Sequence, residues 1–434
     1  MKFVKEKKMR YTKWTVLIYA NGNNELEPEI TKAIEEFKME HINDTFNIVV
    51  QLARANEELV QKLRGPIYIN QKERWSGVRR YIINENGIHE VEILENVNMA
   101  DSKTLYNFLL WGVNNYPSDY IMTVLSGHGA GFIGAMTDFT QEKPYLMSLD
   151  SLVNVFYNLY KTTKKKIEVL LLDSCYMNLI EIWHELANVE FNPIKYLVIA
   201  SENVKIDGIP YLIFIRYLQE EVKKVKNTKE KLIDAIKKFN KNDKIEEKLI
   251  LVNLEKNKFE ELKICFDNIA KIIIENNINI EKVLKKELSY KKTNPFINII
   301  YLYNIINSQL GYTPSEINYI LELVKDIVIY PSMKVLSNDV NSGPSIYMTD
   351  SLSEFEEFRR YYKKLLFLSN NNWIVVLDRN EKLVAKESEY IKNYNILEPP
   401  IVLKNKYIIS SILEQRSNIS VEEAIEILKK LGWY

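Results

Sequence analysis

Short apolar runs that alternate with stretches of helical periodicity constrain this chain more than any other feature. Between Trp14 and Ser201, runs rich in Val, Ile, Leu and aromatic residues are separated by segments long enough to hold a helix. The expected strands are Val16–Ala20, Phe46–Leu52, Tyr120–Leu125, Ile167–Leu172 and Tyr196–Ala200. This alternation predicts a mostly parallel sheet with helices on both faces, which is an α/β/α sandwich.

Other segments complete the expected architecture. Trp75–Leu94, with turn residues at Asn84–Gly87, predicts a β-hairpin inserted between the second and third core strands. Ser148 is an N-cap residue in front of a predicted helix. Beyond about residue 220 the chain is rich in lysine and mainly helical, with further strands expected at Leu249–Asn253, Pro344–Met348 and Trp373–Leu377. We therefore expect an α/β domain over 12–225, a mainly helical region with a few strands over 226–390, and a C-terminal extension over 391–434.

The C-terminal extension contains one predicted helix. Glu398-Pro399-Pro400 interrupts regular structure, since consecutive prolines continue neither a helix nor a central strand. Ser420 and Glu423 form a capping-box pattern, and apolar residues follow on one helical face up to Leu431. This helix either docks on the protein itself or binds a partner.

Composition excludes several classes of partner and suggests a compartment. Lysine plus arginine and aspartate plus glutamate both total 58, so no overall charge attracts the protein to nucleic acid or to anionic lipid. The basic segment Lys2–Arg10 before Trp14–Ala20 imitates a signal peptide, but the apolar part is short and rich in β-branched residues, which favours a strand. Two cysteines cannot form a disulfide framework. We therefore expect a cytoplasmic protein with no transmembrane helix.

Two of the predicted strands end in reactive residues. The run Tyr120–Leu125 leads into Ser126-Gly-His128-Gly129, and Ile167–Leu172 leads into Asp173-Ser174-Cys175. In open α/β sheets the chemistry occurs beyond the carboxyl ends of the strands. His128 and Cys175 should therefore meet at one edge of the sheet.

The residue types at this edge are those of thiol catalysis. A catalytic cysteine acts as a thiolate, and a helix predicted at Asn178–Leu186 would place its N-terminus beside Cys175 and favour that form. His128 would transfer protons, while the backbone N–H groups of Gly129 and Cys175 would form an oxyanion hole. A lone free cysteine is more often buried filler, which is our interpretation of Cys265. His128 and Cys175 at neighbouring strand ends make the same explanation improbable for Cys175.

Asp173 has two interpretations. Its carboxylate could cap the following helix or satisfy the turn. It could instead form the base of a pocket for an Arg or Lys side chain of a substrate.

These motifs resemble the clostripain family of cysteine peptidases, which shares a structural clan with caspases, gingipains, legumain and separase. His128 precedes Cys175 by 47 residues, close to the separation of about 50 expected in caspase-type proteases. The resemblance covers most of residues 12–380. It extends to Trp14–Leu26 with its Asn-Asn-x-Leu turn, Ser126–Gly131, Asp173–Met177 with Glu181, Ser201-Glu202 with Gly208–Tyr211, and Gly343–Tyr347 with Trp373.

The resemblance implies a caspase-like catalytic domain and a cysteine endopeptidase that cleaves after Arg or Lys. By this resemblance His128 and Cys175 are the catalytic dyad, Asp173 selects the basic side chain, and Ser201 and Glu202 line the substrate pocket. The Gln-Ala-Cys signature of caspases is absent, which argues against cleavage after aspartate. Proteins or peptides are the expected substrates, and the C-terminal helix is the expected site for any partner protein.

Several alternatives stay open at this point. The protein could be a catalytically silent regulator or scaffold of the same fold, or an acyl or peptide transferase using the same dyad. No cofactor is required for thiol catalysis. Calcium is used in part of the family, and Asp138, Glu142 and Asp150 could contribute scattered oxygens, although no EF-hand spacing is present. Lys143 precedes Pro144, so we expect any activating self-cleavage to use another site, such as Lys161–Lys166.

Overall fold

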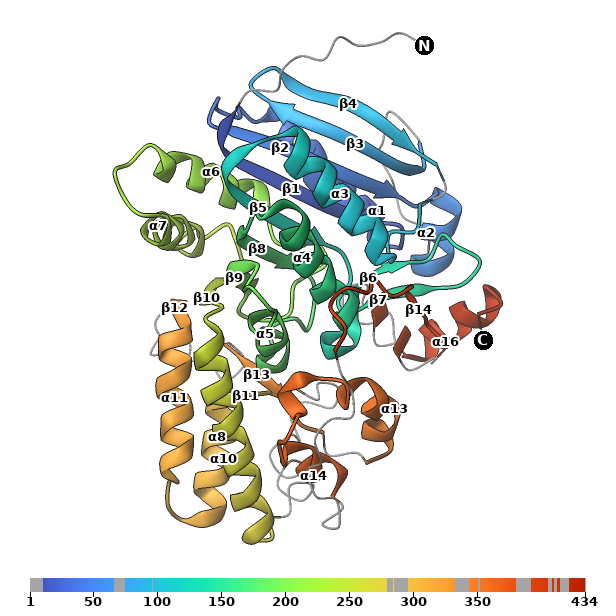
Figure 1. Ribbon diagram of the computed structural model, residues 1–434. Coiled ribbons are helices and arrows are strands. Elements are labelled where there is room, and N and C mark those ends of the chain that lie inside the picture. Colours follow the sequence, from blue (N-terminus) through green and yellow to red (C-terminus); the bar gives the residue numbers. More distant parts are fainter. Residues whose placement is uncertain are drawn as a thin grey trace.

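A nine-stranded sheet runs through the molecule and carries residues from both the N-terminal and the middle part of the chain. The computed structural model describes residues 11–65, 75–95, 97–278, 284, 296–331, 343–349, 352–379, 392–404, 408, 409, 412, 413 and 421–433. The strand order is β12-β10-β9-β8-β5-β1-β2-β3-β4 (Figure 1). The strands are β1 (Thr12–Gly22), β2 (Phe46–Arg54), β3 (Gly77–Asn84), β4 (Gly87–Leu94), β5 (Ser118–Ser126), β8 (Ile167–Asp173), β9 (Ile194–Ala200), β10 (Leu249–Asn253) and β12 (Val328–Tyr330).

The five central strands are parallel, as the alternation of strands and helices predicts. β2, β1, β5, β8 and β9 pair side by side in parallel, and antiparallel strands extend both edges. All five predicted core strands, the hairpin and the strand Leu249–Asn253 are confirmed. Because β10 and β12 join the sheet, it does not end at residue 225, where we placed the end of the first domain. The three-part division itself stays a prediction.

Alternate residues of the central strands face two separate cores. In β1, Val16 and Ile18 pack on one face, and Leu17 and Tyr19 pack on the other. The first face is covered by α1 (Glu27–Glu35), η1 (Glu36–Met39), α6 (Tyr211–Val222) and α7 (Thr228–Asn240). The second is covered by α3 (Ser102–Asn115), α4 (Leu149–Thr163), α5 (Ile180–Ala187) and α8 (Lys256–Glu275). The predicted α/β/α sandwich is therefore confirmed.

A small three-stranded sheet lies next to the carboxyl ends of the central strands. It joins β6 (Gly134–Asp138) and β7 (Tyr145–Ser148) to β14 (Ile401–Val402) from the C-terminal extension. The short helix η2 (Gly131–Ile133) leads into β6, and α2 (Glu57–Arg64) contacts α16 (Val421–Lys430). Ser148 caps α4 by accepting from the backbone N–H of Ser151, as predicted.

The remaining elements form the lower part of the molecule in Figure 1. They are β11 (Phe296–Asn298), α10 (Ile299–Leu310), α11 (Ser315–Ile327), β13 (Ser345–Tyr347), α13 (Leu352–Tyr362), η4 (Leu366–Leu368) and α14 (Trp373–Asp378). The strand predicted at Pro344–Met348 is confirmed as β13, and the predicted tail helix is confirmed as α16.

The strand predicted at Trp373–Leu377 is wrong, because these residues form helix α14. Asn372 donates its backbone N–H to the side chain of Asp267 on α8 at 2.7 Å, and Asn371 accepts from the N–H of Trp373 at 2.9 Å. These contacts fix the start of a helix that packs on α8. A short apolar run is ambiguous between a buried strand and a buried helix, and here the long-range contacts decide.

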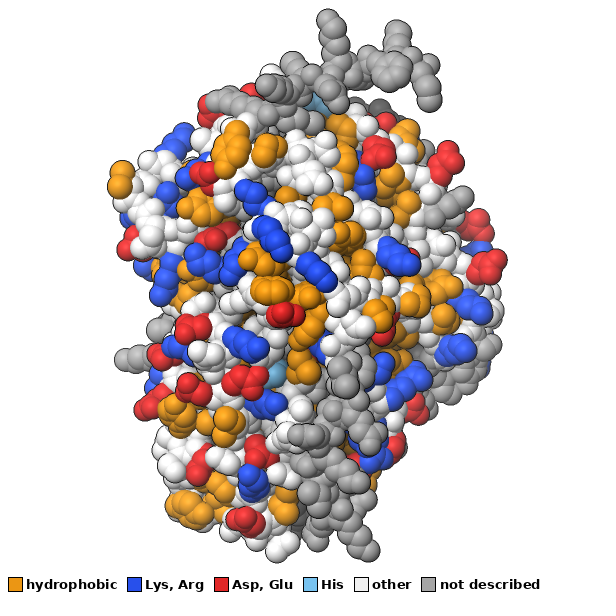
Figure 2. Space-filling view, in the orientation of Figure 1, with side chains coloured by type: hydrophobic (Ala, Val, Ile, Leu, Met, Phe, Trp, Pro, Cys, Tyr) orange, Lys and Arg blue, Asp and Glu red, His pale blue; other side chains and the backbone are white. Residues whose placement is uncertain are grey.

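The surface carries no dominant charge on the face that Figure 2 shows. Lysine and arginine side chains are interspersed there with aspartate and glutamate. This agrees with equal numbers of basic and acidic residues in the chain. Among the described residues, no helix is both long and apolar enough to cross a membrane.

Candidate active site

The loops that follow β5 and β8 touch each other at the edge of the sheet. Ser126 and Asp173 are register partners at the ends of these strands, and the N–H of Gly127 donates to the carbonyl of Asp173 at 3.2 Å. A Cβ atom at Gly129 would lie 2.1 Å from the carbonyl oxygen of Cys175, so only glycine fits there. The predicted meeting of the His128 and Cys175 loops is therefore observed.

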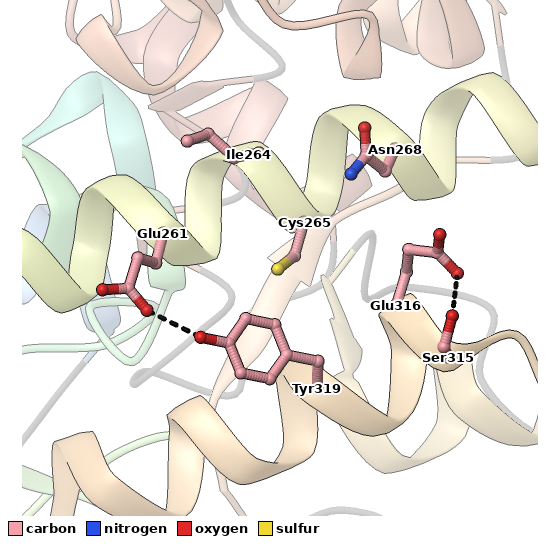
Figure 3. A pocket seen from close by; sticks show the side chains of 7 residues that line it. All are labelled: Glu261, Ile264, Cys265, Asn268, Ser315, Glu316 and Tyr319. Carbon is pink, nitrogen blue, oxygen red and sulfur yellow. Dashed lines mark hydrogen bonds between the residues drawn. The ribbon is translucent and has the colours of Figure 1, made fainter.

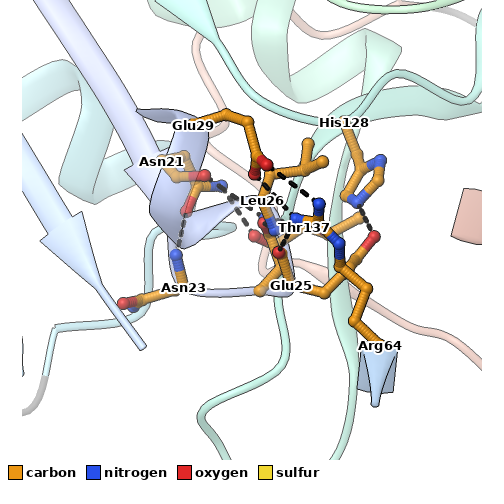
Figure 4. Close-up of polar contacts among 9 residues, drawn as sticks. Asn21, Asn23, Glu25, Leu26, Glu29, Arg64, His128 and Thr137 are labelled. Atoms are coloured by element: carbon orange, nitrogen blue, oxygen red, sulfur yellow. Dashed lines mark hydrogen bonds and ion pairs between the residues drawn. The ribbon is translucent and has the colours of Figure 1, made fainter. Parts of the chain in front are cut away.

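His128 is held by an acidic residue from a third strand end. Its Nε2 lies 2.6 Å from Oε1 of Glu25, and both side chains are fully buried (Figure 4). The other ring nitrogen, Nδ1, has no hydrogen-bond partner among the described residues. The ring also lies near Phe139, with 6.4 Å between the ring centroids. The imidazole thus has one occupied nitrogen and one available nitrogen.

Cys175 is fully buried, and its thiol donates to the carbonyl of Val204 at 3.2 Å. The helix that we expected directly beside it begins later, since α5 starts at Ile180 and not at Asn178. Tyr176 intervenes with a φ of 56°, a left-handed conformation that turns the chain before the helix begins. Because the dipole effect fades within the first turn, α5 gives Cys175 less support than we expected.

Asp173, the last residue of β8, is buried at this edge, with 2% of its surface exposed. Its Oδ2 accepts from the hydroxyl of Ser126 at 2.6 Å, and its Oδ1 accepts from the backbone N–H of Ile209 at 2.8 Å. A Cβ at Gly208 would lie 2.8 Å from Oδ2. The carboxylate thus satisfies a turn of the chain, and the segment that would line a substrate pocket covers it.

The two further residues predicted to bind substrate lie on that same segment. Ser201 is buried, and its carbonyl accepts from the side chain of Asn178 at 3.0 Å and from the N–H of Gly343 at 3.1 Å. Glu202 is exposed. Ser201 therefore fastens the loop after Cys175 to the C-terminal region, whereas Glu202 lies at the surface of the segment.

Glu25 was not among the predicted site residues, and only the structure brings it to His128. In the sequence it is the variable position of the Asn-Asn-x-Leu turn, although the turn follows β1, the strand next to β5. The rule that led to His128 and Cys175 applies equally to this third strand end. Only the order of strands, which the sequence does not state, shows that Glu25 and His128 are neighbours.

Asn178 and Glu181 connect the cysteine loop to the rest of the chain. Asn178 donates to the carbonyl oxygens of Ser201 and Gly343, both at 3.0 Å. Glu181 accepts from the N–H of Tyr347 at 2.7 Å and from the hydroxyl of Tyr362 at 2.8 Å. Three of these four bonds span more than 160 residues along the chain, so no local pattern could have predicted them.

Cys265, the second cysteine, lies far from this edge in a pocket between α8 and α11. The pocket has a volume of about 350 Å³, and Glu261 and Tyr319 line it together with Cys265 (Figure 3). Burial raises the pKa of the Cys265 thiol to about 11. Such a thiol is almost entirely protonated at neutral pH, which fits its predicted role as a packing residue.

Two of the three acidic residues considered for calcium have other partners, and the third, Glu142, is exposed. Asp138 accepts from the side chain of Asn23 and from the N–H of Met99. Asp150 lies 3.3 Å from the ammonium of Lys392. In the described part of the chain, no group of three or more His, Cys, Asp or Glu side chains is placed to hold a metal ion.

Comparison with solved structures shows a shared fold. A C11 protease zymogen from Parabacteroides distasonis, described as inactive, has a TM-score of 0.58 at 15% identity, covering 82% of this chain and 97% of that one. A secreted C11 cysteine protease from Bacteroides thetaiotaomicron, in complex with an irreversible peptide inhibitor, has a TM-score of 0.53 at 16% identity, covering 81% and 98%. A secreted protease from the same species, iotapain, has a TM-score of 0.51 at 12% identity, covering 85% and 99%.

These structures contradict the cytoplasmic location that we predicted, because two of them are of secreted proteases. The apolar segment near the N-terminus is indeed a strand, β1. That result concerns the fold and not the compartment. Composition was therefore a poor guide to location.

Comparison with sequences identifies the family. None of the curated proteins matches this chain. The model of the clostripain family, Peptidase_C11, matches residues 18–379, which is most of the chain. The protein therefore belongs to the clostripain family and is a cysteine peptidase of caspase-like fold.

Proposed function

We propose that this peptidase is an endopeptidase that cleaves after Arg or Lys, with Cys175 as the nucleophile and His128 as the acid and base. The observation that carries the proposal is the contact between Gly129 and the Cys175 carbonyl at the ends of two adjacent strands. It brings one thiol, one imidazole and the carboxylate of Asp173 to the same edge of the sheet. The peptide inhibitor bound to the Bacteroides thetaiotaomicron protease supports a peptide substrate.

The chemistry follows a thioester route. The Cys175 thiolate adds to the carbonyl carbon of the scissile bond, and the oxygen that gains the negative charge is stabilised by the N–H groups of Gly129 and Cys175. The C–N bond then breaks as His128 protonates the leaving nitrogen, which leaves a thioester. A water molecule gives a proton to His128 and attacks the thioester. The acid product leaves, and the Cys175 thiolate is restored.

Specificity for a basic side chain comes from Asp173. The side chain of Asp173 is in a residue that is only 2% exposed, so it would attract a guanidinium or ammonium group that becomes buried beside it. Few water molecules remain there to screen the attraction between the two charges. Glu202 is exposed on the chain segment after β9 that covers Asp173, and it adds a negative charge to the surface there. The secreted proteases of the same fold support action outside the cytoplasm.

The test is hydrolysis of fluorogenic peptides ending in Arg, Lys or Asp. We expect turnover after Arg and Lys only, and complete loss in Cys175→Ala. Cys265→Ala is the matched control, since it removes the other buried cysteine and should keep full activity. Asp173→Ala should lower kcat/KM for basic peptides by about a hundredfold, as expected for the loss of one buried charged pair. Cleavage that continues in Cys175→Ala would refute the proposal.

The burial of Cys175 and His128 favours a second candidate, a catalytically silent regulator with the same fold. A chloromethyl ketone with an Arg side chain separates the two functions, because it alkylates a nucleophile only after binding. Labelling of Cys175 in the wild type, but not in Asp173→Ala, supports the peptidase. Absence of labelling under all conditions supports the silent regulator.

A further inference from the structure

We propose that Glu25 is a positioning residue for His128, and that the imidazole consequently transfers protons through Nδ1. This inference rests on the function proposed above. It concerns a residue that does not touch the reacting atoms but determines which nitrogen of the histidine can do so.

The first step is the proton on the ring. A neutral imidazole has one N–H donor and one acceptor nitrogen, and an ionised carboxylate only accepts. The distance of 2.6 Å between Nε2 of His128 and Oε1 of Glu25 therefore places the hydrogen on Nε2. Nδ1 is then the basic nitrogen. Nδ1 is also a fully buried polar atom with no hydrogen-bond partner in the described part of the chain, so this nitrogen is available to accept a proton from a reacting group.

The second step is the rigidity of Glu25. The carbonyl of Glu25 accepts from Nη1 of Arg64 at 3.1 Å, and both carboxylate oxygens of Glu29 hold the guanidinium of Arg64 at 2.7 and 2.9 Å. Figure 4 shows Glu25 between Arg64 and His128. A short turn after β1 is thereby fixed from the side of α2, so the carboxylate needs little reorganisation to hold the imidazole.

The third step is a support shared by both residues. At the end of β1, just before the turn that carries Glu25, the side chain of Asn21 donates to the carbonyl of Thr137 at 2.6 Å. In the histidine loop, the carbonyl of His128 accepts from the N–H of Met136 at 2.9 Å. Thr137 and Met136 are neighbours in β6, so one strand sets the distance between the carboxylate and the ring. An arrangement held from both sides is preorganised for catalysis.

The charges around the pair define the expected pH dependence. The ionisable groups bonded around the pair are Glu25, Glu29, Arg64, Asp138, Asp173 and Cys175, and Glu27, which pairs with Arg54, lies two residues from Glu25. Of these groups, Glu25 is the one whose hydrogen bond to the ring of His128 is seen in the described part of the chain. Its negative charge stabilises the imidazolium, which must persist until the leaving nitrogen is protonated.

Glu25→Gln tests this role. We expect kcat to fall about a hundredfold with little change in KM, because proton transfer and not binding is impaired. The alkaline limb of the profile of kcat/KM against pH should move to lower pH by about one unit, since the imidazolium loses its carboxylate. Glu25→Asp, which restores the charge on a shorter side chain, should recover part of kcat.

Glu27→Gln is the matched control for the fold. Glu27 is a buried carboxylate two residues away that pairs with Arg54 and Thr31 instead of a histidine. Its loss should lower the melting temperature without moving the alkaline limb. An unchanged limb in Glu25→Gln, or the same shift in Glu27→Gln, would overturn the proposal.

A readout that does not need activity separates this inference from the proposed function. The chain has only four histidines, so ¹⁵N-labelled histidine gives a simple spectrum. In Cys175→Ala, His128 should carry its proton on Nε2 at neutral pH, and adding Glu25→Gln should change that nitrogen signal. A proton on Nδ1 would refute the role of Glu25 even if the enzyme is an active peptidase. A proton on Nε2 in a protein that cleaves nothing would refute the peptidase proposal alone.

Discussion

At the scale of single residues, Glu181 is a buried carboxylic acid whose charge is unfavourable. Burial raises its pKa to about 7 from an ordinary value of 4.5, although bonds from Tyr347 and Tyr362 favour the charged form. The folded protein therefore binds this proton more tightly than the unfolded chain does. Stability from this group is greatest below pH 4.5, falls as the pH rises toward 7, and is constant above that.

We expect Glu181→Gln to remove this dependence on pH. The amide oxygen keeps an acceptor for Tyr347 and Tyr362, and no charge forms at high pH. The difference in free energy of unfolding between variant and wild type should change by roughly 3 kcal/mol in favour of the variant between pH 4 and pH 8. Denaturant titrations at several pH values measure this. Parallel curves for the two proteins would contradict the prediction.

At the scale of elements, the segment 203–209 covers the proposed active site. Val204 accepts from the Cys175 thiol, Ile209 donates to Asp173, and the side chain of Asn203 accepts from the N–H of Tyr176 at 3.1 Å. One segment thus covers Cys175 and Asp173 together. If Cys175 is the nucleophile, as we propose, substrate binding requires this segment to move, since Cys175 has no exposed surface.

Weakening the closed segment should expose Cys175. Asn203→Ala removes the bond to Tyr176, which contributes about 1 kcal/mol, so iodoacetamide should alkylate Cys175 about fivefold faster than in the wild type. Asp207→Asn is the control, because Asp207 lies on the same segment and its pair with Lys32, at 3.8 Å, is exposed to solvent. Mass spectrometry of the intact protein gives the rates. Equal rates in Asn203→Ala and wild type would show that the segment does not limit access.

At the scale of the whole molecule, residues 392–404 bind across α4 and α5, although the family model ends at residue 379. The ammonium of Lys392 is buried and lies 2.8 Å from Glu185 and 3.3 Å from Asp150. Burial opposes ionisation of Glu185, but the charges and hydrogen bonds of Lys392 and His184 together outweigh it and lower the pKa of Glu185 to about 2. This segment also supplies β14, next to the strands that support His128.

Lys392→Met should destabilise the protein by about 3–5 kcal/mol, because it leaves the carboxylate of Glu185 buried without its cation. Lys161→Met is the matched control, since Lys161 bonds to Asn395 of the same segment at an exposed position. That change should cost less than about 1 kcal/mol. Chemical denaturation measures both values. If both variants lose a similar free energy of unfolding, the buried pair of Lys392 and Glu185 stabilises the protein no more than the exposed bond of Lys161 does.

Local pattern was sufficient to predict the central sheet and the meeting of two loops at its edge. The apolar runs from Val16 to Ala200 predicted five strands, and the loops directly after two of them, which carry His128 and Cys175, touch as expected. These inferences succeeded because burial of a parallel strand leaves a continuous apolar run in the sequence, and because parallel strands end at one edge.

Contacts between distant parts of the chain decided the rest. The start of α14 depends on Asp267, and the pairing of Glu25 with His128 depends on β1 lying beside β5. Likewise, Lys392 finds its partners more than 200 residues earlier. A sequence records which side chains are apolar and how they repeat, so it determines the strands and where they end. Which polar group faces which is set by packing in three dimensions, so the third residue at the histidine, the closing segment and the docked C-terminal extension were decided by the tertiary structure.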